Sequence, residues 1–288
     1  GDRFLLMKYT NRHHLPDPVV RALTSYEKGE KVEGLRVTTL IDSPRISQLR
    51  QSNAALLTED VSDMVWKIMG TAIHEVFEKA ASNAYVSEER LSHTVDGTVI
   101  SGAIDYQFED DGEVDLKDYK STSTYSITSG DKPEWERQLN VYAYLIRHAK
   151  GLKVRSASVI AVLRNWTKSQ AERSSSYPQA SIAEVKIKLW SDEEQDAYVK
   201  ERVRLHRVAE LEKDFGLPPC TPDEQWAKPS KWAVYKGSSK RAKLFDTEDD
   251  AQEFAGQSKD CSVVERPATL TRCENNYCRV ADFCDQWR

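Results

Sequence analysis

Two carboxylates and a lysine lie close together in the middle of the chain. Asp105 ends a Gly-Ala-Ile-Asp segment, and Asp118 and Lys120 belong to an Asp-Tyr-Lys segment that begins thirteen residues later. Residues 98–108 are rich in β-branched and aromatic side chains, and Asp-Asp-Gly at 110–112 signals a turn, so we expect a hairpin that brings the two acids together. Because a buried carboxylate without a partner is costly, the pair suits a divalent cation, with Lys120 orienting a water or neutralising a phosphate. The alternative is a solvated hairpin with exposed charges.

An amphipathic helix is predicted upstream, over residues 61–81, where apolar residues recur at helical spacing. His74 lies off the apolar stripe and shares a face with Gly70, one turn earlier. Glycine inside a helix costs about 1 kcal/mol relative to alanine, so Gly70 indicates that another segment passes close by. His74 is then either a ligand delivered to the hairpin or a solvated histidine.

A second helix is predicted to begin at Pro133, because proline suits the first helical position and apolar residues follow at helical spacing. Gln138 and Tyr142 are four residues apart and therefore face the same way. An amide beside a phenol can hold a nucleic-acid backbone or a water, although such a pair also occurs on ordinary helix edges.

Taken together, the motifs Gly-x-x-x-His, Asp, Asp-x-Lys and Gln-x-x-x-Tyr resemble, in order and spacing, the RecB-like branch of the PD-(D/E)XK nucleases. The resemblance covers about residues 70–142 and implies an α/β fold with a restriction-endonuclease-like core, a mixed sheet flanked by helices. It implies metal ligation by His74, Asp105, Asp118 and the main-chain carbonyl of Tyr119, a catalytic role for Lys120, and DNA positioning by Gln138 and Tyr142. Ile104 precedes the first acid in place of proline, a departure that is usual in this branch.

Cysteines provide an independent clue, because Cys273, Cys278 and Cys284 fall within the last sixteen residues. Their irregular spacing matches paired CxxC zinc knuckles poorly and suits an iron-sulfur cluster better, which needs a fourth cysteine. We choose Cys220, which follows a stiff Leu-Pro-Pro segment, and expect Cys261 to be a free core thiol. A zinc site is the main alternative. A disulfide pair is disfavoured by the odd cysteine count and by the lack of a secretion signal.

Some nucleases of the same family are similar in this respect. The CRISPR-adaptation nucleases and the AddB-type helicase-nucleases hold a 4Fe-4S cluster with a C-terminal cysteine triplet. Their fourth cysteine usually precedes the nuclease core, whereas this chain has no cysteine before Cys220. The arrangement looks like that of stand-alone, phage-encoded members, and the cluster it implies is structural, since phosphodiester hydrolysis needs no electron.

At 288 residues the chain can bury a sizeable core and carry an appended module. We expect an N-terminal arm and leading helices over residues 1–60, the nuclease core over 61–216, and a small C-terminal cysteine-clamped module with a basic insertion over 217–288. Within the core, strands are expected at 153–163 and 181–190, separated by a polar loop. Ser191 then begins a long helix with a capping box.

The net charge of −5 argues against indiscriminate DNA binding, but one segment is basic. Residues 226–245 contain no acid, and aromatic residues are interleaved with the cations. Such a mixture suits a single strand whose bases stack on the rings, with a solvated hairpin as the alternative. The DNA-binding candidates of this segment are Lys228, Lys231, Lys236, Lys240, Arg241, Lys243 and Trp232.

The resemblance and these residues together imply a Mg²⁺- or Mn²⁺-dependent DNA exonuclease. Its expected substrate is single-stranded or end-frayed DNA, hydrolysed by a metal-activated water, in phage DNA recombination or processing. A recombinase, a helicase or a second copy of the chain are the candidate partners. No apolar run suits a membrane span, so we expect no membrane partner and a cytoplasmic location, in the bacterial host if the protein is phage-encoded. The alternatives are a non-cleaving DNA-binding accessory protein and a structure- or sequence-specific endonuclease.

Overall fold

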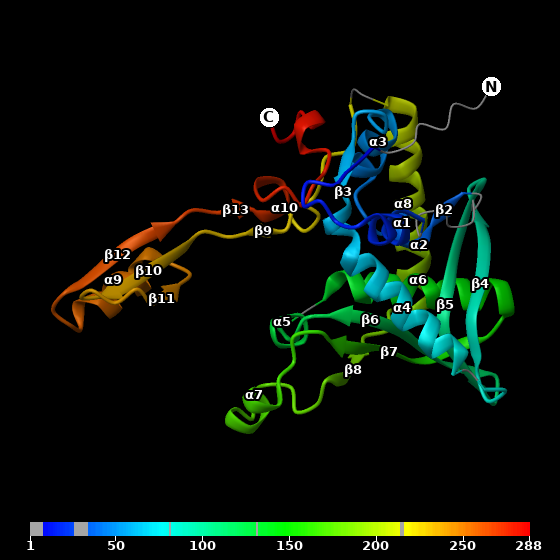
Figure 1. Cartoon of the computed structure of the whole chain (residues 1–288), viewed down its shortest axis with the longest axis horizontal. Helices are drawn as coiled ribbons and strands as arrows, with labels where there is room; N and C mark the ends of the chain where they lie inside the picture. The colour runs from blue at the N-terminus through cyan, green and yellow to red at the C-terminus, as the bar shows by residue number, and fades with distance from the viewer. Residues whose placement is uncertain (1–7, 26–33, 81, 131, 214–215) are drawn as a thin grey trace.

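The computed structural model describes residues 8–25, 34–80, 82–130, 132–213 and 216–288, and its centre is a six-stranded mixed sheet (Figure 1). The strands are β2 (Leu35–Arg36), β4 (Val86–Val95), β5 (Thr98–Asp110), β6 (Glu113–Thr122), β7 (Lys153–Leu163) and β8 (Ile182–Ile187). β4 pairs along one edge of β5, whereas β6 and the short β2 pair with different parts of its other edge. Helices flank this sheet, as the α/β prediction requires.

Strands β4, β5 and β6 form a meander joined by two tight Asp-Gly turns. Asp96 and Gly97 have φ values of 47° and 79°, and Asp111 and Gly112 have 49° and 76°. This left-handed backbone is the conformation that two-residue hairpin turns require, and Asp-Gly adopts it readily. The hairpin predicted around Gly112 is therefore confirmed, whereas strand β4 was not anticipated.

A crossover connects β6 to the parallel strand β7 through α5 (Thr124–Thr128) and α6 (Pro133–Lys150). Helix α6 begins with Pro133 in its first turn and ends at Gly151, whose φ is 69°. Both the helix and the strand at 153–163 were predicted correctly. The main core forms where α6 covers the sheet, and its fully buried members include Ile100, Ile104, Leu116, Leu139, Leu145 and Ile146. Each such side chain stabilises the fold by roughly 1.5–3 kcal/mol.

Helix α4 (Val65–Lys79) lies on the other face of β6, where its Phe77 ring packs 4.5 Å from the Tyr119 ring, centroid to centroid. The helix predicted over 61–81 is divided into a 3-10 turn η1 (Val61–Met64) and α4, with residue 81 outside the described residues. Its amphipathic pattern does not mark a core face, because no residue of α4 is buried. The close approach expected at Gly70 is also wrong, since a Cβ there would meet nothing within 4 Å.

The N-terminal elements are β1 (Lys8–Thr10), α1 (Asp17–Ser25), α2 (Val37–Leu40), α3 (Pro44–Ser52) and β3 (Thr58–Asp60). Helix α3 packs against α8 (Asp192–Glu212), which begins with the predicted capping box between Ser191 and Glu194. The polar loop expected between β7 and β8 contains a short helix, α7 (Lys168–Arg173). Among the described residues, no helix combines the length and apolar character needed to cross a membrane.

A projection from the core, here called the arm, comprises residues 227–270 (Figure 1). Its base is a ribbon of β9 (Ala227–Lys228) and β13 (Thr269–Leu270), and its body is the sheet β11-β10-β12 with α9 packed on it. The remaining bounds are β10 (Lys231–Lys236), β11 (Ala242–Phe245), α9 (Glu248–Gly256) and β12 (Cys261–Arg266). After the arm the chain returns to the core through α10 (Thr271–Glu274) and η2 (Ala281–Phe283).

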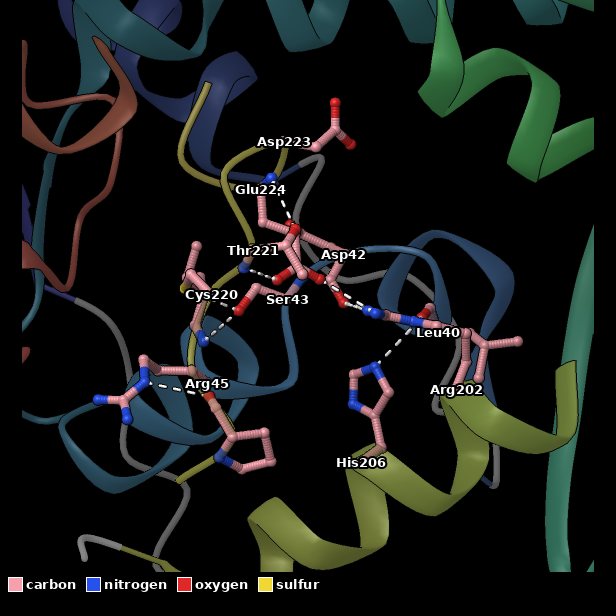
Figure 2. Close-up of polar contacts among 12 residues, drawn as sticks. Leu40, Asp42, Ser43, Arg45, Arg202, His206, Cys220, Thr221, Asp223 and Glu224 are labelled. Carbon is pink, nitrogen blue, oxygen red and sulfur yellow. Dashed lines mark hydrogen bonds and ion pairs between the residues drawn. The ribbon is translucent and has the colours of Figure 1, made fainter. Parts of the chain in front are cut away.

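A polar cluster joins the N-terminal helices, α8 and the segment that leads into the arm (Figure 2). Arg202 of α8 donates to the Leu40 carbonyl at 2.9 Å and to Glu224 at 3.1 Å, and also contacts the Asp42 carbonyl. Nε2 of His206 lies 3.2 Å from the same Leu40 carbonyl. Because these segments meet at buried charges, their relative placement is specified by hydrogen bonds as well as by apolar packing.

Candidate active site

The two predicted acids lie where strands β5 and β6 separate. The strands pair only from Tyr106 opposite Lys117 to Asp110 opposite Glu113, so pairing has ended at Asp105 and Asp118. Both carboxylates are nevertheless almost fully buried, with 4% and 2% of their residue surface exposed. The hairpin thus brings both acids to the end of its paired region, inside the protein.

Asp105 is held by the neighbouring strand and by helix α4. Its Oδ2 accepts a hydrogen bond of 2.7 Å from the backbone N–H of Tyr119, and its Oδ1 lies 3.3 Å from Nδ1 of His74. His74 therefore does reach the hairpin from the helix, as the metal-ligand hypothesis requires. The solvated alternative for His74 does not describe this position, because its side chain is 33% exposed and contacts a buried acid.

Glu88 of β4 joins this group, although the sequence pattern did not single it out. Its Oε1 lies 3.6 Å from Nδ1 of His74. The ladder between β4 and β5 pairs Ser87 with Tyr106 and Glu89 with Ile104, and omits Glu88 and Asp105 between them. Glu88 also has a φ of 51°, which is unusual for a residue other than glycine. This local break in the strand brings an acid to the site.

Lys120 and Asp118 form a second group with two residues of α6. Nζ of Lys120 lies 2.8 Å from Asp118 Oδ2 and donates to Oε1 of Gln138 at 2.9 Å. Nε2 of Gln138 donates to the Tyr142 hydroxyl at 3.0 Å and lies 3.4 Å from Asp118 Oδ1. Gln138 and Tyr142 are themselves buried. Gln138 thus contacts the lysine and Tyr142 contacts Gln138, while DNA positioning by the pair stays a prediction.

The titration of the site follows from burial and from the charges around it. Burial raises the pKa of Asp118, although Lys120 opposes this shift. Burial alone would lower the pKa of Lys120, but the Asp118 carboxylate outweighs it and the pKa of Lys120 is raised. Hydrogen bonds to Asp105 and Glu88 raise the pKa of His74 to about 10. Negative charge therefore predominates around His74, and a cation is favoured there.

The residues present fit a divalent metal ion. Among the described residues, His74, Glu88 and Asp105 form the group whose ligand atoms all lie within 4.8 Å of one another. One imidazole and two carboxylates form a donor set that suits Mn²⁺ or Mg²⁺. Asp118 lies in the adjoining group with Lys120, and the backbone N–H of Tyr119 donates to Asp105. The predicted ligands are therefore adjacent, and Glu88 lies beside them as a further candidate.

Gly102 is a further residue that the site depends on. A Cβ added to it would lie 2.6 Å from Cε1 of Tyr142 and 2.9 Å from Cγ2 of Val37. Only glycine lets the Tyr142 ring pack against strand β5. The glycine at position 102 is thus explained by the aromatic ring from α6, which is far away in the sequence.

A pocket of about 300 Å³ opens beside Lys120, and we call it the catalytic pocket. It is lined by Lys120 and Gln138 together with Ile41, Ser121, Thr122, Ser126, Glu134 and Trp135. Trp66 of α4 is exposed, and the Arg164 guanidinium lies 4.4 Å from its ring centroid. Because Lys120 lines this pocket, its side chain is accessible to a substrate, although its carboxylate partner Asp118 is buried.

Four cysteines gather where the C-terminal segment returns to the core. Cys220, Cys278 and Cys284 are buried and pack in one cluster with Ile46 and Leu49 of α3. Burial raises the pKa of Cys220 to about 11, and burial and neighbouring cysteines also raise the pKa values of Cys273 and Cys278. Cys261 lies apart, half-buried in β12 of the arm, so it is a free thiol but not a core thiol.

Polar groups surround the buried cysteines. Ser43 Oγ lies 3.1 Å from Cys220 Sγ (Figure 2). NH1 of Arg45 lies 4.0 Å from Cys284 Sγ. The side chain of Gln286 bonds both the N–H and the carbonyl of Cys220, at 2.7 and 2.9 Å. Segments 43–45, 220 and 284–286 are thereby tied to one another around the thiols.

The basic segment 226–245 is divided over different parts of the arm. Lys231 is ion-paired with Asp246, and Lys243 lies 4.1 Å from the Phe254 ring centroid of α9. Trp232 is half-buried in β10. Lys228 is at the base of the arm, whereas Lys236, Lys240 and Arg241 are exposed around the turn after β10. The seven candidates are therefore spread over the base of the arm, its sheet and the turn after β10.

Comparison with known proteins agrees with this geometry. Residues 37–285 match the sequence profile of the PD-(D/E)XK nuclease superfamily. The chain therefore belongs to this superfamily, and it is a metal-dependent nuclease of the PD-(D/E)XK type, for which Mg²⁺ or Mn²⁺ is the usual metal. No curated protein matches the chain.

Several solved structures are similar to this chain. A protein named SSO0001 is 17% identical, with 66% of this chain and 85% of that one covered and a TM-score of 0.46. The alkaline exonuclease LHK-Exo from Laribacter hongkongensis is 13% identical over 61% of this chain and 88% of that one, with a TM-score of 0.35. A putative exonuclease from Eubacterium rectale is 11% identical over 88% and 84%, with a TM-score of 0.28.

Proposed function

We propose that the protein is a Mn²⁺- or Mg²⁺-dependent DNA exonuclease that degrades single-stranded or end-frayed DNA. The observation that carries this proposal is the meeting of His74, Glu88 and Asp105 beside the pair of Asp118 and Lys120. Lys120 of the second group lines the catalytic pocket, so this group is open to a ligand. The fold and the superfamily support nuclease chemistry, and the proposal adds the substrate and the mode of attack.

The roles of the residues follow from their contacts. His74, Glu88 and Asp105 would hold the metal, with Asp118 and the Tyr119 carbonyl as the remaining ligands. When bound, a divalent ion supplies a Lewis acid and lowers the pKa of a bound water. Asp118 and Gln138 fix the Lys120 ammonium, which then donates to a phosphate oxygen and stabilises the negative charge that develops during hydrolysis.

The cysteine cluster is proposed to hold a structural 4Fe-4S cluster through Cys220, Cys273, Cys278 and Cys284. Zinc is the competing occupant, and it binds four thiolates at about 2.3 Å each, which places the sulfurs close together. The iron-sulfur cluster is proposed because the irregular spacing of the three C-terminal cysteines matches paired CxxC zinc knuckles poorly. The cluster would join α3, the Cys220 segment that precedes the arm and the C-terminal segment that follows it.

The arm is proposed as a second DNA contact. Its exposed cations at the distal turn, Lys236, Lys240 and Arg241, can meet phosphates away from the catalytic pocket. A role in phage DNA recombination or processing, in the cytoplasm of a bacterial host, with a recombinase, helicase or second copy as partner, is part of the same proposal. It is supported by the sequence resemblance described above.

The test combines metal analysis with a cleavage assay. Protein purified without oxygen is examined by visible absorption and iron analysis, then given Mn²⁺ and end-labelled single-stranded DNA. We expect a brown protein with a broad band near about 400 nm, as thiolate-bound iron-sulfur clusters show, and stepwise digestion that Lys120→Ala abolishes.

Each other outcome removes a named part of the proposal. A colourless, zinc-loaded protein that cuts DNA retains the nuclease and excludes the iron-sulfur cluster. A brown protein that binds DNA but never cuts it indicates the accessory protein instead. Cutting of closed circular single strands identifies an endonuclease, and Lys120→Ala with full activity refutes the site.

A further inference from the structure

A cleft of about 690 Å³ separates the nuclease core from the base of the arm. One wall consists of α5 and the first turns of α6, and the other consists of the segments around Trp226 and Tyr277. Figure 1 shows α5 and the beginning of α6 facing the base of the arm. We call this space the aromatic cleft, because Tyr125, Trp226 and Tyr277 line it.

The aromatic cleft adjoins the catalytic pocket. Ile41 and Glu134 line both cavities, and Glu134 also lies close enough to Lys120 to raise its pKa further. A chain-like ligand that passes Lys120 can therefore continue between the core and the base of the arm.

The rings in this cleft are exposed to solvent, although large aromatic side chains are usually buried for the most part. Trp226, Tyr277 and Tyr125 are 43%, 61% and 70% exposed. The Trp226 and Tyr277 rings are 5.3 Å apart, and the Arg272 guanidinium lies 5.3 Å from the Trp226 ring centroid. Exposed flat rings beside a guanidinium are the groups on which unpaired bases stack.

The surrounding contacts hold these groups in place. Arg272 donates to both carboxylate oxygens of Asp42, at 2.8 and 3.0 Å, and to the Glu224 carbonyl at 3.1 Å. Trp226 has a φ of 51°, a left-handed conformation that is strained for tryptophan. Its backbone N–H donates to the Asp223 carbonyl at 3.0 Å. A strained tryptophan that is fixed and yet exposed is consistent with a binding role.

Most acids of the cleft are already paired. Asp42 binds Arg272, Asp223 binds Arg137 and Glu224 binds Arg202. Lys132 and Lys228 also line the cleft, and Glu134 is the acid on the side of the catalytic pocket. The lining thus offers stacking rings without net charge, since its basic and acidic residues are equal in number. Exposed rings suit a strand with unpaired bases better than a duplex, whose base faces are already covered.

We propose that the aromatic cleft is the path of a single nucleic-acid strand to Lys120, with bases stacked on Trp226, Tyr277 and Tyr125. This inference rests on the proposed function, because it assigns the route by which the substrate reaches that site. It agrees with the sequence-based expectation at Trp226, which begins the basic segment 226–245, and adds two further rings. Tyr125 lies in α5 and Tyr277 follows α10, so both are outside the basic segment.

The test measures binding separately from cleavage. Fluorescein-labelled oligothymidylate is titrated with full-length protein, without added divalent cation, and its anisotropy is followed. Loss of one stacked base is expected to weaken binding about tenfold in Trp226→Ala and in Tyr277→Ala. Trp226→Phe and Tyr277→Phe keep a ring and should retain most of the affinity. Leu211→Ala, at an 80% exposed position of α8 outside the cleft, is the control and should bind like the wild type.

An abasic oligonucleotide identifies stacking itself. A single abasic position, moved along the strand, should weaken binding to the wild type at one or two positions. The same lesion should cost nothing further in Tyr277→Ala or Trp226→Ala, because the ring that it faced is already gone. Losses that add fully at every position would overturn the proposal.

The remaining outcomes separate this inference from the proposed function. Wild-type protein that binds the strand through the two rings, yet hydrolyses neither DNA nor bis(p-nitrophenyl) phosphate with Mn²⁺, refutes the nuclease and keeps the cleft. Wild-type protein that cuts DNA while both alanine variants bind normally keeps the nuclease and refutes the cleft. Equal weakening in the phenylalanine and alanine variants also refutes it, since a retained ring would then have no effect.

Discussion

At the scale of single residues, the site depends on a residue that departs from its strand. Glu88 has a φ of 51° and is omitted from the β4–β5 ladder, so its side chain reaches His74. Its neighbour Glu89 stays paired and bonds Gln107 at 2.7 Å and Lys150 at 3.0 Å instead. Two adjacent glutamates thus serve different groups, and this makes them a matched pair for experiment.

Substitution of Glu88 should weaken metal binding. Glu88→Gln removes one negative charge beside His74 and Asp105, so we expect the Mn²⁺ concentration for half-maximal cleavage to rise by about tenfold or more. Glu89→Gln is the control and should leave the Mn²⁺ dependence close to that of the wild type. Identical Mn²⁺ titrations for Glu88→Gln and the wild type would exclude Glu88 as a ligand.

A second prediction at this scale separates two roles for Gln138. If Gln138 positions Lys120, then Gln138→Ala should lower kcat by about tenfold to a hundredfold and leave KM for DNA nearly unchanged. If it holds the DNA backbone instead, KM should rise. Steady-state kinetics on one oligonucleotide decide between these results. Tyr142→Phe keeps the ring that packs on Gly102 and loses only the hydroxyl, so we expect a smaller kcat effect from it.

At the scale of elements, the junction of α2 with α8 should make stability depend on pH. Burial and the charge of Arg202 lower the pKa of His206 from its ordinary value of 6.5 to about 4. The unfolded chain therefore binds more protons between these values, and the stability that neutral His206 provides is complete above about pH 6.5 and is lost as the pH falls toward 4.

The expected size follows from that difference in pKa. Between about pH 7 and pH 5, His206 should account for about 2 kcal/mol of lost stability. His206→Gln keeps a polar side chain but cannot titrate, so its urea midpoint should fall less over the same range. Tryptophan fluorescence during urea unfolding measures both proteins at both pH values. Parallel losses in the two proteins would show that other groups cause the acid sensitivity.

Elements with strong local signals were predictable from the sequence, and those defined by distant contacts were not. The Asp-Gly turn at Gly112 specifies its hairpin locally, and the capping box at Ser191 specifies the start of α8. The helix α4 was predicted, but its apolar stripe is not buried, because periodicity locates apolar residues and not the surface that would cover them. Nothing local marks the backbone break at Glu88 or the meeting of Gly102 with Tyr142.

At the scale of the whole molecule, the arm places positive charge away from the catalytic pocket. Its sheet is reached through the β9–β13 ribbon, and the turn after β10 lies at the opposite end of that sheet (Figure 1). Lys236, Lys240 and Arg241 are exposed there, whereas Lys231 and Lys243 are engaged within the arm. A long strand can therefore meet both the aromatic cleft and the distal turn, but a short one can meet only one of them.

This geometry predicts a dependence on DNA length. Replacing Lys236, Lys240 and Arg241 together with alanine should weaken binding of long single strands and reduce the slope of log affinity against log salt by about 2, since each phosphate contact contributes about 0.7. Oligonucleotides just long enough to fill the aromatic cleft should bind the triple variant like the wild type. Anisotropy titrations over a range of salt concentrations and DNA lengths provide both quantities.

The control for this experiment removes the same number of charges elsewhere. Lys186 and Lys188 near strand β8 and Lys200 of α8 are exposed, and their joint replacement by alanine lowers the net charge equally. If that variant loses the same salt slope, binding responds to the overall charge of the protein and the arm has no special role. If only the arm variant loses it, and only with long DNA, the distal turn contacts the strand. The arm would then raise the local concentration of DNA at the cleft, because a strand held at one contact reaches the second as an intramolecular event.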